Sequence, residues 1–220
     1  MGPTLQPRIK VCCIRSPEEA ALAVRAGASA LGLVSAMPSG PGVISDAEIR
    51  VLAKLVPPGV ASFLLTSRGA AGSIAEQVRA ARVDTVQLCD RLTSGGYLAL
   101  REALPNVKIV QVVHVTGAES IDEAQAASAG VDAILLDSGN PSLAVKELGG
   151  TGRRHDWSIS RAIRESVPVP VYLAGGLTPV NVRDAIDTVS PFGLDVCSGV
   201  RTNGALDPTK LDAFIAAARA

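Results

Sequence analysis

The 220-residue sequence is poor in aromatic residues and carries no net charge. Phe, Tyr and Trp make up 3% of it, too few for the stacking platforms that bind single-stranded nucleic acid. Its 21 basic and 21 acidic residues cancel, so no overall field draws a polyanion to the surface. No apolar run approaches the roughly 20 residues of a membrane span, and the first residues lack the apolar stretch of a secretion signal. We therefore expect a cytoplasmic protein that binds neither nucleic acid nor membranes.

The sequence also lacks the ligand spacing of a metal site. Its four cysteines, Cys12, Cys13, Cys89 and Cys197, include no CxxC pair, and there are only two histidines. Such a chain predicts reduced thiols and no bound metal. Cys13, Cys89 and Cys197 are expected to serve as small packing residues.

Short apolar runs rich in β-branched residues recur along the chain and predict eight strands. Hydrophobic residues make up 47% of the sequence, enough for one sizeable core of Ala, Val, Leu and Ile. The predicted strands are residues 9–14, 30–34, 61–65, 85–89, 108–113, 133–137, 169–173 and 194–197. Four of the helices between them are expected to begin at hydroxyl caps: Ser16, Ser45, Ser120 and Thr178.

Eight strand–helix units predict a (β/α)₈ TIM barrel over residues 9–220, preceded by a tail of residues 1–8. A doubly wound open sheet is the alternative. Two observations favour the barrel. AGASAL at residues 26–31 is echoed by AGVDAI at residues 129–134, four units later, and no GxGxxG follows the first strand, where a dinucleotide-binding sheet would have it.

In a barrel of this kind the active site lies at the carboxyl ends of the strands. Two glycine-rich turns follow the last two strands, and their backbone N–H groups are placed to hold a phosphate. The predicted phosphate-binding residues are Gly175, Gly176, Ser198 and Gly199. Ordinary strand-to-helix turns would look the same. The turns therefore predict a phosphorylated small-molecule substrate.

A thiol and a carboxylate at strand ends are candidates for proton transfer. Cys12 closes the first strand and Asp137 closes the sixth, so both project towards one mouth, where they can act as base and acid. On the residues alone, a cysteine that fills the core and an aspartate that caps a loop remain alternatives. Further candidates at strand ends, with a substrate-binding role, are Gln87, His114 and Asp195. The glycine-rich loop after the sixth strand suits either a lid or a solvated loop.

These motifs, in this order, resemble those of the phosphoribosylanthranilate isomerase family. The segments that carry the resemblance are Lys10-Val-Cys-Cys-Ile, against K-(I/V)-C-G-I; Gln87-Leu, against the start of Q-L-H-G; Leu136-Asp-Ser with Gly149-Gly-Thr-Gly and Asp156-Trp, against L-D-S and G-G-T-G-x-x-x-D-W; Ala174-Gly-Gly-Leu-Thr-Pro-Val-Asn-Val, against A-G-G-L-x-P-x-N-V; and Gly193-Leu-Asp-Val-Cys-Ser-Gly-Val, against G-(V/L)-D-V-S-S-G-V.

The resemblance implies an Amadori rearrangement of an aminoaldose phosphate to an aminoketose phosphate. Cys12 matches the general base, which takes the proton from sugar C2, and Asp137 matches the general acid, which protonates the ring oxygen. The turns around Gly176 and Ser198 would hold the phosphate. No metal or organic cofactor is implied. We expect a monomer or a homodimer.

Several positions depart from the family pattern. Cys13 replaces a glycine, Cys89 and Asp90 stand where the pattern has His-Gly, and Arg201 stands where an acidic residue is usual. The loop of residues 38–42 reads PSGPG, where the family has S-P-R, so the arginine that contacts the anthranilate carboxylate has no clear counterpart. A second hypothesis is therefore a divergent barrel that acts on another sugar phosphate, or that binds one without catalysis.

Overall fold

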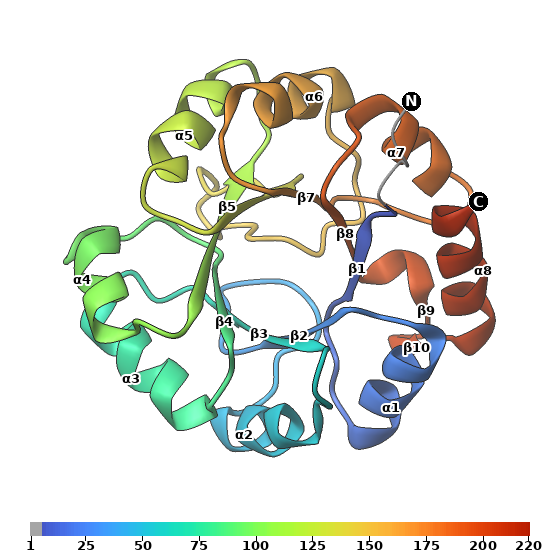
Figure 1. Cartoon of the computed structure of the whole chain (residues 1–220), viewed down its shortest axis with the longest axis horizontal. Coiled ribbons are helices and arrows are strands. Elements are labelled where there is room, and N and C mark those ends of the chain that lie inside the picture. The colour runs from blue at the N-terminus through green and yellow to red at the C-terminus, as the bar shows by residue number, and fades with distance from the viewer. Residues whose placement is uncertain (1–5) are drawn as a thin grey trace.

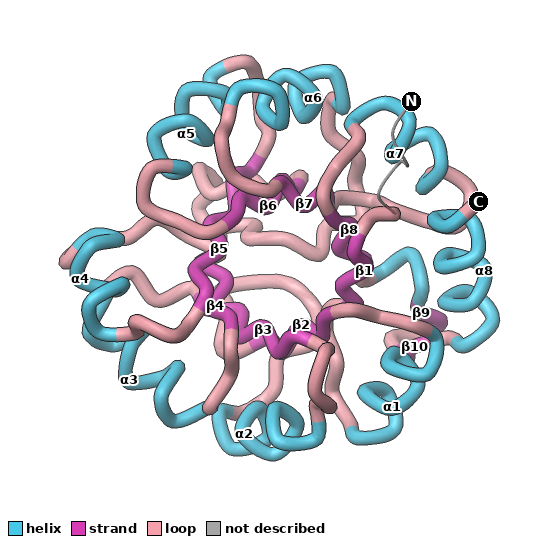
Figure 2. The backbone as a smooth tube through the Cα atoms, viewed as in Figure 1, coloured by secondary structure: helices cyan, strands magenta, loops and turns pink. Residues whose placement is uncertain are grey.

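Eight parallel strands form a closed barrel with helices on its outside (Figure 1; Figure 2). The computed structural model describes residues 6–220. The first strand pairs with both the second and the eighth, and Lys10 lies opposite Asp195 at the closing seam. An open sheet has no such seam, so the fold is a single-domain (β/α)₈ TIM barrel, as predicted. The predicted tail lies mostly outside the described residues, and the first strand begins at Arg8, one residue before the expected start.

The barrel strands are β1 (Arg8–Val11), β2 (Ala30–Val34), β3 (Ala61–Thr66), β4 (Thr85–Leu88), β5 (Lys108–His114), β6 (Ala133–Asp137), β7 (Val171–Leu173) and β8 (Gly193–Val196). The helices are α1 (Pro17–Ala26), α2 (Asp46–Leu55), α3 (Ala71–Ala81), α4 (Gly96–Ala103), α5 (Glu119–Ser128), α6 (Trp157–Ser166), α7 (Val182–Val189) and α8 (Pro208–Arg219), with the short 3₁₀ helix η1 (Ser198–Val200) after β8.

All eight predicted strands are present, but six differ from the prediction at one or both ends. The differences at β3, β4 and β5 are of one residue each. β1 stops at Val11 and not at residue 14, because Cys13 has a left-handed backbone with φ of 63° that no strand accommodates. β7 begins at Val171, after Pro170, whose missing N–H cannot join the ladder. β8 ends at Val196, one residue earlier than expected. The loop that carries Cys12 therefore starts sooner than the apolar pattern indicated.

Two of the four predicted helix caps are confirmed. Ser16 accepts a hydrogen bond from the Glu19 N–H, and Ser45 forms a complete capping box with Glu48. Ser120 is not a cap, because α5 begins one residue before it and its hydroxyl accepts from Thr116. The prediction at residue 178 is wrong as well, since a turn intervenes and α7 begins only at Val182.

The core has two parts. A larger cluster of Ala, Val, Leu and Ile fills the space between barrel and helices, and a smaller one fills the barrel interior. Two of the few aromatic rings, Phe63 and Tyr172, pack edge to face inside the barrel with centroids 6.1 Å apart. The core is therefore mostly aliphatic, as the composition predicted, but both parts also use rings, since Trp157 and Phe214 belong to the outer cluster.

A small hairpin, β9 (Arg201–Thr202) with β10 (Ala205–Leu206), follows η1 and was not predicted. Its turn is Asn203-Gly204, with φ of 51° and 80°. Asn-Gly is the strongest short signal for a two-residue hairpin, so the sequence did carry this information.

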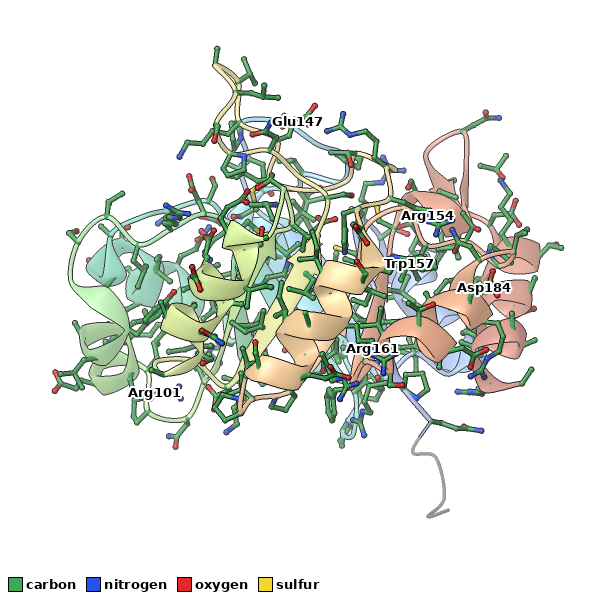
Figure 3. All side chains as sticks on the ribbon, turned by 90° about the horizontal axis from the view of Figure 1, so that it is seen from above. Arg101, Glu147, Arg154, Trp157, Arg161 and Asp184 are labelled. Carbon is green, nitrogen blue, oxygen red and sulfur yellow. The ribbon has the colours of Figure 1, made fainter. Side chains whose placement is uncertain are left out.

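The loops that follow the strands gather at one end of the barrel. Figure 3 shows Glu147 in a loop that rises above this end, with Arg101 at the opposite end. Within residues 6–220, no helix is long and apolar enough to cross a membrane.

Candidate active site

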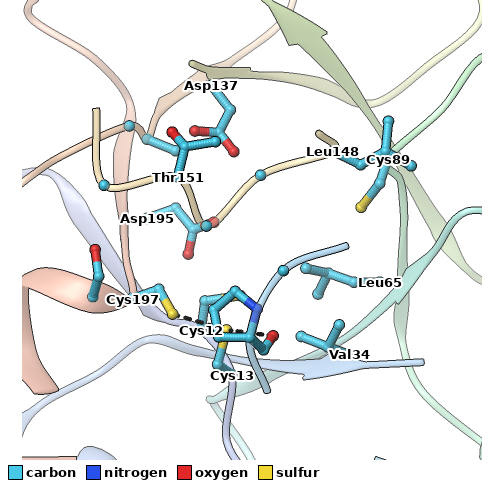
Figure 4. Close-up of a pocket in the computed structure, with 18 of the residues that line it drawn as sticks. Cys12, Cys13, Val34, Leu65, Cys89, Asp137, Leu148, Thr151, Asp195 and Cys197 are labelled. Atoms are coloured by element: carbon cyan, nitrogen blue, oxygen red, sulfur yellow. Dashed lines mark hydrogen bonds between the residues drawn. The ribbon is translucent and has the colours of Figure 1, made fainter. Parts of the chain in front are cut away.

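A cavity opens at the carboxyl end of the barrel, where every strand except β5 contributes lining residues, either from the strand itself or from the loop after it (Figure 4). Its empty space, open solvent at the mouth included, is about 670 Å³. Seven of the nine predicted site residues line it: Cys12, Gln87, Asp137, Gly175, Gly176, Asp195 and Ser198.

A buried ion pair lies beneath the cavity. Nζ of Lys10 is fully buried, donates to Oδ2 of Asp195 at 2.8 Å and lies 5.3 Å from the centre of the Phe63 ring. Burial disfavours the ammonium, but the charges of Asp195, Cys12 and Cys89, together with the hydrogen bond to Asp195, outweigh this effect, so the pKa of Lys10 is raised.

Two of the residues that line the cavity have a buried acceptor without a partner. Oδ1 of Asp195 and Oε1 of Gln87 accept no hydrogen bond from the described residues, although both side chains are more than 90% buried. A buried acceptor left unpaired costs about 1–3 kcal/mol. Donors on a bound ligand would remove this cost at both positions.

The thiol of Cys12 is confined by its neighbours. A Cβ placed on Gly32 of β2 would come 2.8 Å from Sγ of Cys12 and 3.3 Å from Nζ of Lys10. Because Gly32 has no side chain, the Cys12 thiol can occupy the space beside the Lys10 ammonium. The next residue, Cys13, turns the chain, and Arg201 holds this turn by donating to the carbonyls of Cys12 and Cys13.

Asp137 faces Cys12 across the cavity in Figure 4. Its Oδ1 accepts from the Ser138 N–H at 2.8 Å, which leaves Oδ2 directed at the loop of residues 148–152. A Cβ on Gly149 would lie 2.6 Å from that Oδ2, so the glycine lets the loop backbone approach the carboxylate. The same loop contacts the 38–42 loop, since a Cβ on Gly150 would lie 2.4 Å from Pro41.

The two glycine turns, one after β7 and one after β8, lie next to each other in the cavity wall. Gly175 and Gly176 have φ of 82° and 63°, which glycine adopts without strain, and their N–H groups donate to no described protein acceptor. Ser198 begins η1 and is exposed at the cavity wall. A Cβ on Gly199 would lie 1.9 Å from the Leu177 carbonyl oxygen, so the two turns are in direct contact.

Two predicted site residues lie outside the cavity. His114 is buried at the end of β5, with Nε2 3.1 Å from the Cys89 carbonyl oxygen, and a Cβ on Gly139 would lie 2.5 Å from its Nδ1. Gly199 lies behind the wall, against Leu177. Their strand-end positions are as expected, but the backbone directs them away from the open space.

Three further residues, Met37, Leu148 and Thr151, line the cavity although no sequence pattern marked them as site residues. Each belongs to a loop, where no periodic pattern indicates which side chains turn inwards. Thr151 lies within GGTG, so the glycines around it were the available signal.

One end of the cavity is apolar and holds no cation. Figure 4 shows Val34, Leu65 and Leu148 grouped on one side, and Met37 lies with them in the lining. No Lys or Arg is among the lining residues, whereas Asp137 and Asp195 are. A carboxylate bound at this end would therefore find no cationic side chain among the lining residues.

The thiols differ in surroundings. Burial raises the pKa of Cys89, so this residue behaves as a packing group in the inner core. All four cysteines are free. Over the described part of the chain, no group of three or more His, Cys, Asp or Glu side chains could hold a metal ion.

Comparison with known proteins identifies relatives along the whole barrel. A family model described as N-(5'phosphoribosyl)anthranilate (PRA) isomerase matches residues 9–217. The N-(5'-phosphoribosyl)anthranilate isomerase 2 of Methanosarcina mazei is 39% identical over 210 residues, which are 94% of this chain and 92% of the relative.

Comparison with solved structures points to the same family. The phosphoribosyl anthranilate isomerase of Thermotoga maritima is 29% identical and superposes with a TM-score of 0.81 over 97% of this chain and 98% of that chain. A phosphoribosyl anthranilate isomerase in complex with reduced 1-(o-carboxyphenylamino)-1-deoxyribulose 5-phosphate is 28% identical, with a TM-score of 0.78 and the same coverage. The extent of the family match and the identity to these relatives show that the chain belongs to the N-(5'-phosphoribosyl)anthranilate isomerase family, whose members are aldose–ketose isomerases of tryptophan biosynthesis.

Proposed function

We propose that this chain converts N-(5'-phosphoribosyl)anthranilate into the corresponding aminoketose phosphate, with Asp137 as general acid and Cys12 as general base. The observation that carries the proposal is that a thiol and a carboxylate, from strands on different sides of the barrel, face the same cavity as two glycine turns. That is the set of groups that an Amadori rearrangement of a sugar phosphate requires.

The chemistry needs two proton transfers. Asp137 donates a proton to the ring oxygen, the bond between this oxygen and C1 breaks, and the nitrogen lone pair forms an iminium ion at C1. The thiolate of Cys12 then removes the proton from C2, which gives an enolamine that tautomerises to the ketone. A thiol suits the second step because it is partly ionised near neutral pH and can return its proton.

The surroundings of Cys12 support its role as the base. Its negative charge would lie above the Lys10 ammonium, whose fixed pairing with Asp195 prevents it from moving away. The ion pair thus acts as a preorganised positive group under the site of proton removal. Lys10 touches no reacting atom in this scheme and is a positioning residue.

The remaining polar groups match the rest of the substrate. The free N–H groups of Gly175 and Gly176, with Ser198, would hold the phosphate dianion. The unpaired oxygens of Gln87 and Asp195 would accept hydrogen bonds from the sugar hydroxyls and the amine N–H. Every buried acceptor in the lining would then have a donor.

Kinetics of two conservative variants test the assignment. Asp137→Asn and Cys12→Ser should each lower kcat by about 10²–10⁴-fold, the usual contribution of one acid or base. Both should still bind reduced 1-(o-carboxyphenylamino)-1-deoxyribulose 5-phosphate in calorimetry, because neither substitution removes a group of the phosphate site. Turnover at the wild-type rate in either variant would rule out that residue's role.

The apolar end of the cavity favours a second candidate substrate. Without a cationic side chain in the lining, the aryl carboxylate gains no bidentate ion pair, so other N-substituted phosphoribosylamines would fit as well. N-(5'-phosphoribosyl)aniline, made from ribose 5-phosphate and aniline, lacks only the carboxylate. We expect its kcat/KM to lie within about tenfold of the anthranilate value, which is about 1.4 kcal/mol. A preference for anthranilate above a hundredfold would favour the first substrate alone. Activity on neither would leave a sugar-phosphate binder without catalysis.

We propose that the enzyme works as a monomer or a homodimer. Light scattering of the purified chain distinguishes the two.

A further inference from the structure

Two thiols that the proposed reaction does not use meet at the closing seam of the barrel. Sγ of Cys13, in the turn after β1, and Sγ of Cys197, directly after β8, lie 2.8 Å apart (Figure 4). The residues are 184 positions apart in the sequence. The family pattern has glycine at the first position and serine at the second, so this chain departs from the pattern at both members of one contact.

The surrounding backbone keeps the two sulfur atoms together. A Cβ on Gly42 would lie 2.9 Å from Sγ of Cys13, so the 38–42 loop closes off the opposite side of this thiol. Arg201 donates to the Cys13 carbonyl and pairs with Glu19 at 2.8 Å, which anchors the turn from below. Cys13 therefore has little freedom to turn away from Cys197.

The two thiols have different reactivity. Hydrogen bonding to Cys13 lowers the pKa of Cys197, and the nearby Arg201 charge adds to this effect. Hydrogen bonds to Cys12 and Cys197, together with burial, raise the pKa of Cys13. Both thiols border the cavity, but Cys197 is half-buried whereas Cys13 is buried. An accessible thiolate beside a buried second thiol is the arrangement of a reactive and a resolving cysteine.

We propose that Cys13 and Cys197 form a reversible disulfide bond when the protein is exposed to a peroxide. The Cys197 thiolate attacks hydrogen peroxide, the O–O bond breaks, and a sulfenic acid and hydroxide form. Cys13 attacks the sulfenic sulfur, the S–S bond forms, the S–O bond breaks, and the hydroxyl leaves with the Cys13 proton as water. A dithiol such as dithiothreitol reverses the change by thiol–disulfide exchange.

The bond would tie the first barrel strand to the last. It closes a loop over most of the chain, and long closed loops restrict the unfolded state most strongly. Because the sulfur atoms are already in contact, closing the bond requires only a small backbone adjustment. The oxidised protein should therefore unfold at a higher temperature than the reduced one.

Peptide mapping of the full-length protein tests the proposal. After treatment with one equivalent of hydrogen peroxide, trypsin should release residues 11–15 linked to residues 184–201, and dithiothreitol should separate the two peptides. Since residues 11–15 contain both Cys12 and Cys13, variants decide between them. The link should persist in Cys12→Ser and disappear in Cys13→Gly and Cys197→Ser, which restore the family residues at those positions.

Thermal unfolding gives an independent readout. Oxidation should raise the Tm of the wild-type chain by about 5 °C or more, an increase that dithiothreitol removes, and should leave the Tm of Cys197→Ser unchanged. A linked peptide that persists in Cys13→Gly, or no linked peptide in the wild type, overturns the proposal. Mass and Tm are both measured without substrate, so these outcomes do not depend on whether the proposed isomerase activity is found.

Discussion

The substitution Gly32→Ala would test whether the position of the Cys12 thiol limits the reaction. The new Cβ would lie 2.8 Å from Sγ of Cys12 and 3.3 Å from Nζ of Lys10. Ordinary contact between such atoms begins near 3.5 Å, so Sγ must withdraw by roughly 0.7 Å. Gly32 is in a regular strand with no left-handed φ, and alanine fits its backbone.

The size of the effect follows from that displacement. Misplacing a reacting group by about 1 Å costs on the order of 10²-fold in rate, so we expect kcat to fall by about 30- to 100-fold, or about 2–2.7 kcal/mol. KM should change little, because the phosphate turns are remote from β2. Overpacking should also lower the free energy of unfolding by about 1–3 kcal/mol, which thermal unfolding would reveal separately.

A second glycine provides the matched control. Gly72, in α3, has no atom within 4 Å of the position that a Cβ would take. Gly72→Ala should therefore leave kcat unchanged and slightly stabilise the helix. Both variants are assayed with N-(5'-phosphoribosyl)anthranilate at a temperature at which Gly32→Ala is folded. If the kcat of Gly32→Ala then lies within threefold of that of Gly72→Ala, the Cys12 thiol is not the base.

Three further results are expected. Lys10→Met leaves Asp195 as a buried charge without a partner, so urea denaturation should show that the free energy of unfolding falls by about 3–5 kcal/mol. The double variant Lys10→Met with Asp195→Leu should restore part of this stability, and an equal loss in both proteins would contradict the ion-pair argument. Arg201→Gln releases the carbonyl of Cys13 and should lower kcat by about tenfold with KM nearly unchanged; a rise in KM alone would point to the phosphate site instead. The pKa of Glu19 is lowered because its hydrogen bonds, to Arg201 first, outweigh burial, so this contribution to stability is present above its unfolded pKa and is lost as the pH falls through the folded one. The wild-type Tm should therefore drop more steeply than that of Glu19→Gln below about pH 4.5, and parallel curves would refute the assignment.

The barrel was predictable because its signal is local and repeated. Each strand shows as an apolar run, and Ser16 and Ser45 mark helix starts within a few residues. The errors fall where a distant contact decides the local geometry. Cys13 ends β1 early because its left-handed turn is held by Arg201, a residue nearly the whole chain away.

The candidate site was predictable in part for the same reason. Strand ends predict which residues meet at the mouth, and Cys12 and Asp137 do so. Whether a strand-end side chain turns into the cavity depends on the twist of its strand, and His114 turns away from it. The pairing of Lys10 with Asp195 was not predicted, since the motifs that contain these two residues do not show which face of its strand each side chain occupies.

The seam between β1 and β8 also has a consequence for how the protein is made. Lys10 lies in β1, the first barrel strand to be synthesised, while Asp195 lies in β8, the last. The cavity therefore has no complete wall until β8 has been synthesised, and until then Lys10 lacks the carboxylate that neutralises it. The nascent chain must keep β1 unpaired on one edge while the other seven barrel strands are made, which exposes that edge to strand pairing with other chains.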